Sequence, residues 1–282
     1  MSGALLYQRR AAGLLLRMAA ALIVLVVLGP LLWGLSTSLK TEVMAVRLPP
    51  SLIPSPLTVA NYLDVFRDQS FVIDLWNSIA YAFGGVIVAM LVGIPAGYAA
   101  ARFEFRAKHS LMLVILATSM VPGVALLVPT YYVLNMLGLL NNRFVVIVLL
   151  AARITPQTIW FLQSFVLTVP LAIEESASVD GASRLQILLR LVLPLIRPGL
   201  GAVAIIGIVT IWNDYLTVAV FAPDMAKRTL QVALVDQVFN TNGISWCYVM
   251  AFAITSSLPI MIMFGVVQKW FITGLTAGAV KG

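Results

Sequence analysis

Residues 173–199 read IEESASVDGASRLQILLRLVLPLIRPG and form a polar segment between two long apolar runs. The segment contains three acidic residues, three arginines and two prolines. The whole chain has 282 residues, of which 61% are hydrophobic and 10% are charged. Soluble domains carry about 25% charged residues. The composition therefore indicates a membrane protein, in which this segment is a polar loop between two spans.

Six windows are apolar enough to cross a lipid bilayer, which takes about 20 residues of helix. They are residues 18–35, 79–101, 111–137, 144–167, 200–220 and 249–272. We expect the first to be a retained span, because no small-x-small cleavage site follows its long apolar run. The sequence thus predicts an all-α protein with six transmembrane helices and both termini on one side.

The distribution of lysine and arginine gives the orientation, because cytoplasmic loops carry the excess of these residues. With the N-terminus inside, eleven of them lie on the inner face and six on the outer face. Six acids balance the six outer bases, so the net charge of +7 falls on the cytoplasmic face. We therefore expect cytoplasmic termini, and the basic composition needs no nucleic-acid partner.

The sequence lacks residues that several other functions require. Its single cysteine, Cys247, excludes an internal disulfide, and its single histidine, His109, excludes a histidine cluster for a metal ion. It has no G-x-x-x-x-G-K-[ST] phosphate loop. We expect no catalytic residue, no metal and no bound nucleotide on this chain.

The polar segment itself predicts two short helices joined by a tight turn. Pro170 ends the preceding span, and Glu174 and Glu175 lie where carboxylates favour the first turn of a new helix. Asp180 and Gly181 should end that helix, since glycine tolerates the left-handed backbone of a C-cap. A second helix should start near residue 182. An amphipathic loop whose arginines extend along the membrane interface remains an alternative.

Pro194 and Pro198 affect the path of that second helix. Neither residue has a backbone amide to donate, so the helix should bend or restart as it enters the fifth span.

The order of residues in this loop resembles the EAA loop of the membrane subunits of ABC importers. The family pattern is E-A-A, three residues, G, nine residues, then I-x-L-P. The matching positions are Glu175, Ser176, Ala177, Gly181, Leu191, Leu193 and Pro194. Ser176 replaces an alanine and Leu191 an isoleucine, while the spacing is intact.

Further motifs along the chain are similar to the carbohydrate-importer branch, the maltose-permease-G-like subunits. In chain order they are STSLK, LTVANYLDVF, NSIAYA, AGYAAARFEFR, MVPGVALLVPTYYVL, WND, the LP at residues 258–259, and the terminal GAVKG. Each motif is weak alone, and their order is specific.

The resemblance implies a permease subunit of an ATP-driven importer with the type I fold. Its partners would be a second, homologous permease subunit, two ATPase subunits that bind ATP and Mg, an extracytoplasmic solute-binding protein and the lipid bilayer. The loop at residues 170–198, here called the coupling loop, would dock on the ATPase. The residues assigned to this coupling are Glu174, Glu175, Ser176, Ala177, Asp180, Gly181, Leu193 and Pro194.

The expected boundaries follow from the spans. They give a cytoplasmic tail at 1–17, a first transmembrane helix at 18–39, an extracytoplasmic loop at 40–78 with a short helix near 61–66, a transmembrane core at 79–272 and a cytoplasmic tail at 273–282. The expected solute is a sugar or oligosaccharide. A glycerol-phosphate-type ester is the alternative, because Arg153 would suit an anion.

Ionisable residues inside spans are candidates for function. Arg153 and Asp214 are such residues, and Asn213 and Tyr215 flank Asp214, so these four are candidates for the substrate pathway. Arg153 and Asp214 could equally form a structural pair between adjacent helices. Pro122–Val124 and Pro129 would break the third span where loosened backbone can line a cavity, or cause ordinary kinks.

Two other functional classes were weighed. A secondary transporter would need inverted repeats and usually more spans, and no repeat relates the two halves of the chain. An intramembrane enzyme would need paired catalytic groups, which Arg153 and Asp214 do not supply.

Overall fold

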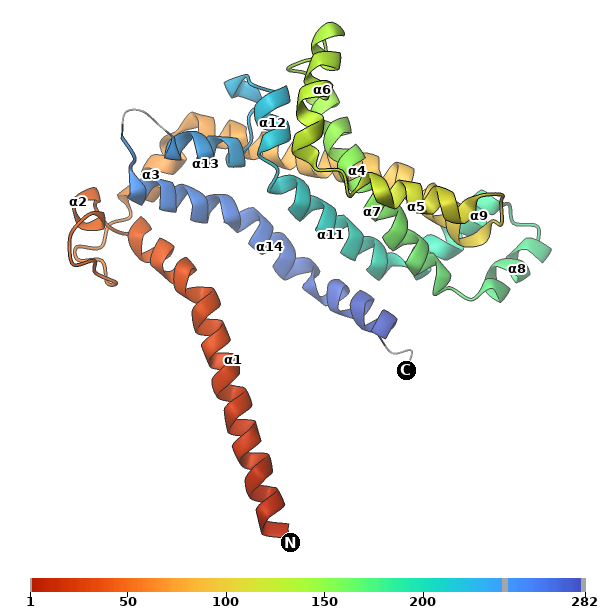
Figure 1. Ribbon diagram of the computed structural model, residues 1–282, viewed down its shortest axis with the longest axis horizontal. Coiled ribbons are helices and arrows are strands. Elements are labelled where there is room, and N and C mark those ends of the chain that lie inside the picture. Colours follow the sequence, from red (N-terminus) through yellow and green to blue (C-terminus); the bar gives the residue numbers. More distant parts are fainter. Residues whose placement is uncertain (1, 240–242, 280–282) are drawn as a thin grey trace. The chain divides into compact units, whose positions relative to one another are not determined.

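The computed structural model describes residues 2–239 and 243–279, and within these ranges its regular elements are all helices (Figure 1). The predicted all-α class is therefore confirmed. The chain divides into two compact units. The first comprises the residues up to Asp68 together with Asp236–Ser257, and the second comprises Gln69–Val235 together with the residues from Leu258.

The first unit contains α1 (Ser2–Ser38), α2 (Glu42–Ala45), α3 (Ala60–Arg67) and the start of α14 (Trp246–Ala279). Helix α3 confirms the short helix expected near residues 61–66. The Glu42 carboxylate accepts hydrogen bonds from the Ser245 hydroxyl (2.6 Å) and the Cys247 amide (2.8 Å). A carboxylate there satisfies free amides at the start of α14 and complements its dipole.

The predicted tails are more helical than expected. Helix α1 starts at Ser2, so the described part of the 1–17 tail is continuous with the first span. Helix α14 continues to Ala279, which makes residues 273–279 helical, while residues 280–282 of that tail lie outside the described residues. An apolar window underestimates the length of a helix, because helical hydrogen bonding continues into the polar residues on either side of the window.

Three long helices form the centre of the second unit. Helix α4 (Gln69–Arg102) packs along α7 (Arg143–Leu167), and α11 (Arg197–Trp212) packs against both. Helix α4 begins ten residues before the predicted window at 79, so residues 69–78 are helical rather than loop.

Glycines allow α4 to approach its neighbours closely. A Cβ atom at Gly85 would lie 2.6 Å from Ile211 Cδ1, and one at Gly93 would lie 2.6 Å from Thr158 Cγ2. At Gly97 it would meet the α7 backbone, 3.0 Å from Gln163 N and 3.1 Å from Ile159 O. Small residues at such positions permit the van der Waals packing on which helix association in membranes depends.

The remaining elements of the chain are short. They are α5 (Lys108–Thr118), α6 (Gly123–Met136), α8 (Leu171–Val179), α9 (Arg184–Ile187), the π-helix η1 (Leu188–Val192), α10 (Leu193–Leu195), α12 (Leu216–Phe221), the 3₁₀ helix η2 (Met225–Lys227) and α13 (Leu230–Val238).

Within the described residues, four helices are long and apolar enough to cross a membrane, and six spans result if two bent helix pairs each count as one. The pair α5 and α6 is bent by 88°. Pro122 caps α6, which confirms the break expected at Pro122–Val124. Pro129 lies inside α6, so of the two alternatives for this residue the helix break is excluded. The pair Arg184–Leu195 and Arg197–Trp212 is bent by 80°.

The fifth span is shorter than predicted. The window 200–220 should have been one helix, but α11 ends at Trp212 and α12 restarts at Leu216. Asp214 explains the break, because its carboxylate accepts a hydrogen bond from the Thr217 amide at 2.9 Å. An aspartate whose side chain accepts a hydrogen bond from a backbone amide a few residues later favours the start of a helix over its interior.

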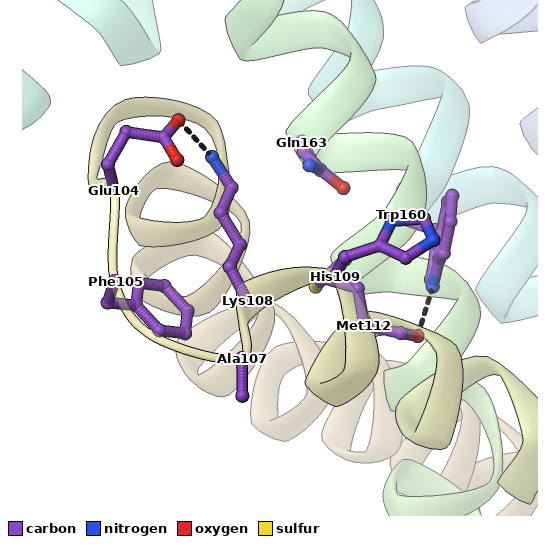
Figure 2. A pocket seen from close by; sticks show the side chains of 8 residues that line it. All are labelled: Glu104, Phe105, Ala107, Lys108, His109, Met112, Trp160 and Gln163. Carbon is purple, nitrogen blue, oxygen red and sulfur yellow. Dashed lines mark hydrogen bonds and ion pairs between the residues drawn. The ribbon is translucent and has the colours of Figure 1, made fainter.

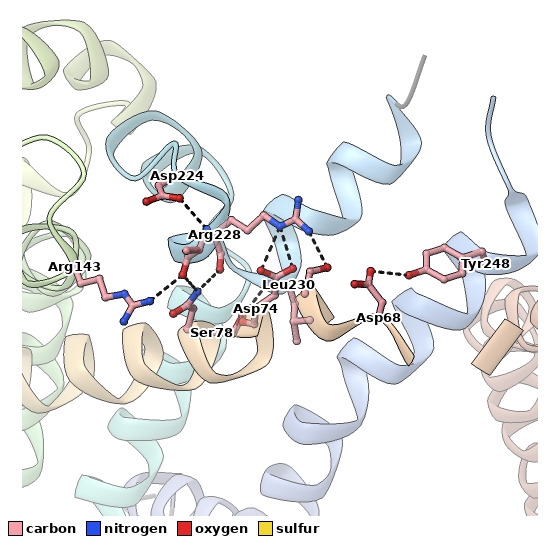
Figure 3. A network of polar contacts seen from close by, with 11 residues as sticks. Asp68, Asp74, Ser78, Arg143, Asp224, Arg228, Leu230 and Tyr248 are labelled. Carbon is pink, nitrogen blue, oxygen red and sulfur yellow. Dashed lines mark hydrogen bonds and ion pairs between the residues drawn. The ribbon is translucent and has the colours of Figure 1, made fainter. Parts of the chain in front are cut away.

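A buried polar network joins the start of α4 to the segment after α12 (Figure 3). Arg228 Nε donates to Asp74 at 3.0 Å, with side chains 9% and 1% exposed. Asn77 donates to the carbonyls of Ala226 (3.0 Å) and Arg228 (2.9 Å), and the Leu230 amide donates to Ser78 (2.9 Å). Asp74 and Arg228 are one of the six acids and one of the six bases expected on the outer face. In the structure they form a buried ion pair.

Replacing Gly97 by valine should prevent close packing of α4 on α7, because the new side chain meets α7 backbone atoms. Overpacking costs about 1–3 kcal/mol. The recovery of monodisperse protein from membranes should fall. Gly29→Val is the matched control, since no atom lies within 4 Å of a Cβ there. Equal recovery of the two variants would contradict this packing.

Candidate functional site

The first helix of the coupling loop is α8, which has nine residues. Pro170 is its N-cap and Asp180 its C-cap, and Gly181 follows with φ 87°. The left-handed backbone at Gly181 is the conformation that glycine adopts without steric cost. The predicted helix, its length and its ending are thus confirmed.

The second helix begins at Arg184, two residues later than expected. Ser183 and Gln186 form a capping box, in which the Ser183 amide donates to Gln186 Oε1 (2.8 Å) and the Gln186 amide donates to Ser183 Oγ (3.3 Å). The pattern S-x-x-Q at 183–186 signals this start in the sequence, and we missed it.

The helix then bends where its prolines predict. It continues through η1 and α10, and it breaks at Ile196 before α11 starts. Pro194 lies in the first turn of α10, just before the 80° bend, and Pro198 lies in the first turn of α11, just after it. A first turn tolerates proline because its amides lack helical partners.

Half of the predicted coupling residues lie on the surface. Glu175, Ser176, Asp180 and Gly181 are exposed, and the apolar side chain of Val179 is 88% exposed. The Ser176 hydroxyl donates to the Ala172 carbonyl at 2.9 Å.

The other predicted coupling residues support the loop from beneath. Ala177, Leu193 and Pro194 are partly buried, and Ala177 and Leu193 pack against an apolar cluster below the loop.

Glu174, which the resemblance assigns to coupling, is the exception among these residues, because its side chain is buried and does not lie on the exposed surface of the loop. Its side chain is 1% exposed and forms an ion pair with Arg102, whose Nε lies 2.6 Å from Glu174 Oε1. The Tyr98 hydroxyl donates to Glu174 Oε2 at 2.8 Å. Because both carboxylate oxygens are bonded inside the chain, Glu174 is not available to a partner in this conformation.

Arg102 also binds the end of a third helix. Its Nη2 donates to the carbonyls of Val166 (2.9 Å) and Val169 (2.7 Å) at the C-terminus of α7. The last carbonyls of a helix have no intrahelical partner and carry partial negative charge. One guanidinium therefore satisfies the end of α7 and holds the first turn of α8, while extending from the last turn of α4.

Arg153 and Asp214 meet as predicted for a pair on adjacent helices. Arg153 Nη1 on α7 donates to Asp214 Oδ2. The Asp214 side chain is 1% exposed, whereas that of Arg153 is 57% exposed. Asn213 is exposed and bonds back to the Val209 carbonyl (2.8 Å), and Tyr215 is partly buried. The structure thus brings Arg153 and Asp214 together. Arg153 and Asn213 reach the surface, whereas Asp214 is buried.

Two polar residues near this pair were missed. Gln157 is exposed one turn below Arg153, and with Thr210 of α11 it lines a shallow groove between α7 and α11. The four-residue spacing from Arg153 puts Gln157 on the same helix face, which is the signal that could have found it. We call Gln157 and Thr210, together with Arg153 and Asn213, which do not line the groove, the polar set.

A larger open pocket, of about 570 Å³, lies where the turn between α4 and α5 approaches α7 (Figure 2). Lys108 Nζ lies 2.9 Å from Glu104 Oε1, and Trp160 Nε1 donates to the Met112 carbonyl at 3.3 Å. The full lining is Glu104, Phe105, Ala107, Lys108, His109, Met112, Trp160 and Gln163. It contains none of the predicted site residues.

Residues 93–277 match the family described as Binding-protein-dependent transport system inner membrane component. The chain is 32% identical to the inner membrane ABC transporter permease protein YcjP of Escherichia coli (strain K12), with 93% of this chain and 94% of YcjP covered. It is 30% identical to the trehalose/maltose transport system permease protein MalG of Thermococcus litoralis, over 95% of this chain and 97% of MalG.

A solved structure has the same fold. It is a chain of a bacterial ABC transporter involved in the import of the acidic polysaccharide alginate, with a TM-score of 0.80 and 24% identity. The similarity covers 94% of this chain and 98% of that chain.

Arg153→Met should lower the stability of the protein more than Asp214→Asn. The first change leaves a buried carboxylate without its cation, which costs about 1–3 kcal/mol. The second keeps an oxygen for the Thr217 amide and leaves an arginine that is already half exposed. Thermal unfolding in detergent measures this difference. Equal melting temperatures for the two variants would exclude the structural pair.

Proposed function

Since the chain belongs to the binding-protein-dependent transport system inner membrane components, we propose that it is the permease subunit of an ABC importer for a sugar or oligosaccharide. It is a transport subunit of the cytoplasmic membrane, not an enzyme, and separate ATPase subunits hydrolyse ATP. The main support for this proposal is the similarity to sugar permeases such as MalG, which extends over nearly the whole chain.

The complex would contain two permease subunits, this chain and a homologous but different one. Two ATPase subunits would hold ATP and Mg, while this chain holds no cofactor. A binding protein would deliver the solute outside. Both termini would be cytoplasmic, which the excess of lysine and arginine on that side supports.

The coupling loop would dock in a surface cleft of an ATPase subunit through α8. The exposed side chains there combine apolar surface at Ile173 and Val179 with negative charge at Glu175 and Asp180. Glu175 would face a basic residue of the ATPase, and an exposed ion pair contributes about 0–1 kcal/mol. Shape and packing would therefore carry most of the coupling.

The polar set would line part of the solute path. Arg153, Gln157 and Asn213 expose hydrogen-bonding groups at the level of the spans, where contact with lipid would be costly. A water-filled path or the second permease subunit would relieve that cost. Sugar hydroxyls both donate and accept hydrogen bonds, which these side chains can match.

A glycerol-phosphate-type solute is the second candidate, because the guanidinium of Arg153 is exposed. Its charge is largely offset by Asp214, which favours the sugar.

The solute class can be tested with the cognate binding protein by calorimetry. A neutral di- or trisaccharide such as trehalose or maltose should bind, and glycerol 3-phosphate should not. Binding of glycerol 3-phosphate alone would replace the sugar proposal with the second candidate.

Ser176→Trp should abolish docking, because the bulky ring would prevent close approach of the exposed face of α8. The ATPase subunit should no longer co-purify with the permease, while Ser176→Ala should bind it normally. The yield of permease monitors folding, since position 176 is exposed. Normal co-purification and solute uptake by Ser176→Trp would refute docking through α8.

A further inference from the structure

We infer that Arg102 is a positioning residue, which together with Glu174 makes α8 move as one body with the cytoplasmic ends of α4 and α7. The inference rests on the proposed docking of α8 and adds α4 to the helices that ATPase closure would move. The chain order alone suggests only α7 and α11, because these are the spans that the coupling loop connects.

Three helix ends meet at one guanidinium. Arg102 extends from the last turn of α4, its Nε binds Glu174 in the first turn of α8, and its Nη2 binds the Val166 and Val169 carbonyls at the end of α7. Arginine is suited to this role because its planar head presents donors in fixed directions. Lysine could not reach carboxylate and carbonyls in the same geometry.

Burial makes this junction resist separation. The side chains of Arg102 and Glu174 are 8% and 1% exposed. Pulling α8 from α4 would leave an unpaired carboxylate in an apolar setting, and breaking a buried pair in this way is strongly unfavourable. The Tyr98 hydroxyl, which also extends from α4, adds a second bond to the same carboxylate.

Apolar packing reinforces the same connection. A buried cluster beneath the coupling loop brings together side chains of α4, α7 and the helix that follows α8. Its members are Tyr98, Val166, Val169, Ile187, Leu188, Val192 and Ile196. Packed interiors transmit displacement instead of absorbing it, so a force on the loop reaches α4 through contacts as well as through charge.

Adjacent glutamates in α8 then have different tasks. Glu175 is exposed and Glu174 is buried, since successive helical residues point about 100° apart. Glu175 would bind the ATPase and Glu174 binds its own chain. Glu175→Gln is therefore a matched control for Glu174→Gln, with the same change in charge one residue away.

Spin labels at Val92→Cys on α4 and Ser178→Cys on α8, both exposed positions outside the docking residues named above, can test this inference. Their separation is measured in the assembled complex without nucleotide and after trapping with Mg-ATP and vanadate. The native junction should give the same distance distribution in both states. Glu174→Gln should make the distribution broaden and shift on trapping, whereas Glu175→Gln should leave it unchanged.

Tyr98→Phe provides a milder variant if Glu174→Gln does not assemble. It removes one hydrogen bond to the carboxylate and should broaden the distribution less. A shift on trapping in the native junction, or an unchanged distribution in Glu174→Gln, would overturn the inference. If the ATPase fails to co-purify with the native permease, the proposed docking fails instead, so the two failures are distinct.

Discussion

The end of the second unit that carries α8 depends on one buried arginine. The ends of α4, α7 and α8 converge there, and helix ends bring unpaired carbonyls, unpaired amides and partial charges that must be compensated. Arg102 satisfies the carbonyl of Val166 in α7, the carbonyl of Val169 just after α7, and the Glu174 carboxylate at once. A loop that must project from the protein is thereby anchored by groups hidden beneath it.

Glycines provide the other condition for this arrangement. Gly97 lies one turn before the end of α4, and its missing side chain lets α4 reach the backbone of α7. The close approach continues along α4 through Gly93 and Gly85. Arg102 can therefore bond to the end of α7 because the two helices already lie in contact.

Local features of the fold could be read from the sequence. Apolar windows located the spans, and Pro170, Asp180 and Gly181 fixed the limits of α8, because proline and glycine act on the backbone where they stand. Features that depend on distant partners could not be read. Glu174 seemed equivalent to Glu175, since its partner Arg102 lies far away in the chain. The same holds for Asp74 with Arg228.

The break in the fifth span shows an intermediate case. Hydropathy continued past Asp214, so the window predicted one helix, but the side chain of Asp214 competes for the backbone and restarts it. The pairing of Arg153 with Asp214 was expected as one of two possibilities, whereas the groove that Gln157 and Thr210 line emerged only with the packing of α7 on α11.

Ser176, the small departure from the family pattern, is chemically modest. Its hydroxyl proton is already given to the Ala172 carbonyl within α8, so the residue has no donor left to offer outward. A docking protein would meet a side chain that is similar in size to alanine and, like alanine, offers it no hydrogen-bond donor. Serine and alanine could therefore replace each other at position 176 without a compensating change in the partner. Position 176 would then be a poor guide to which ATPase this permease recognises.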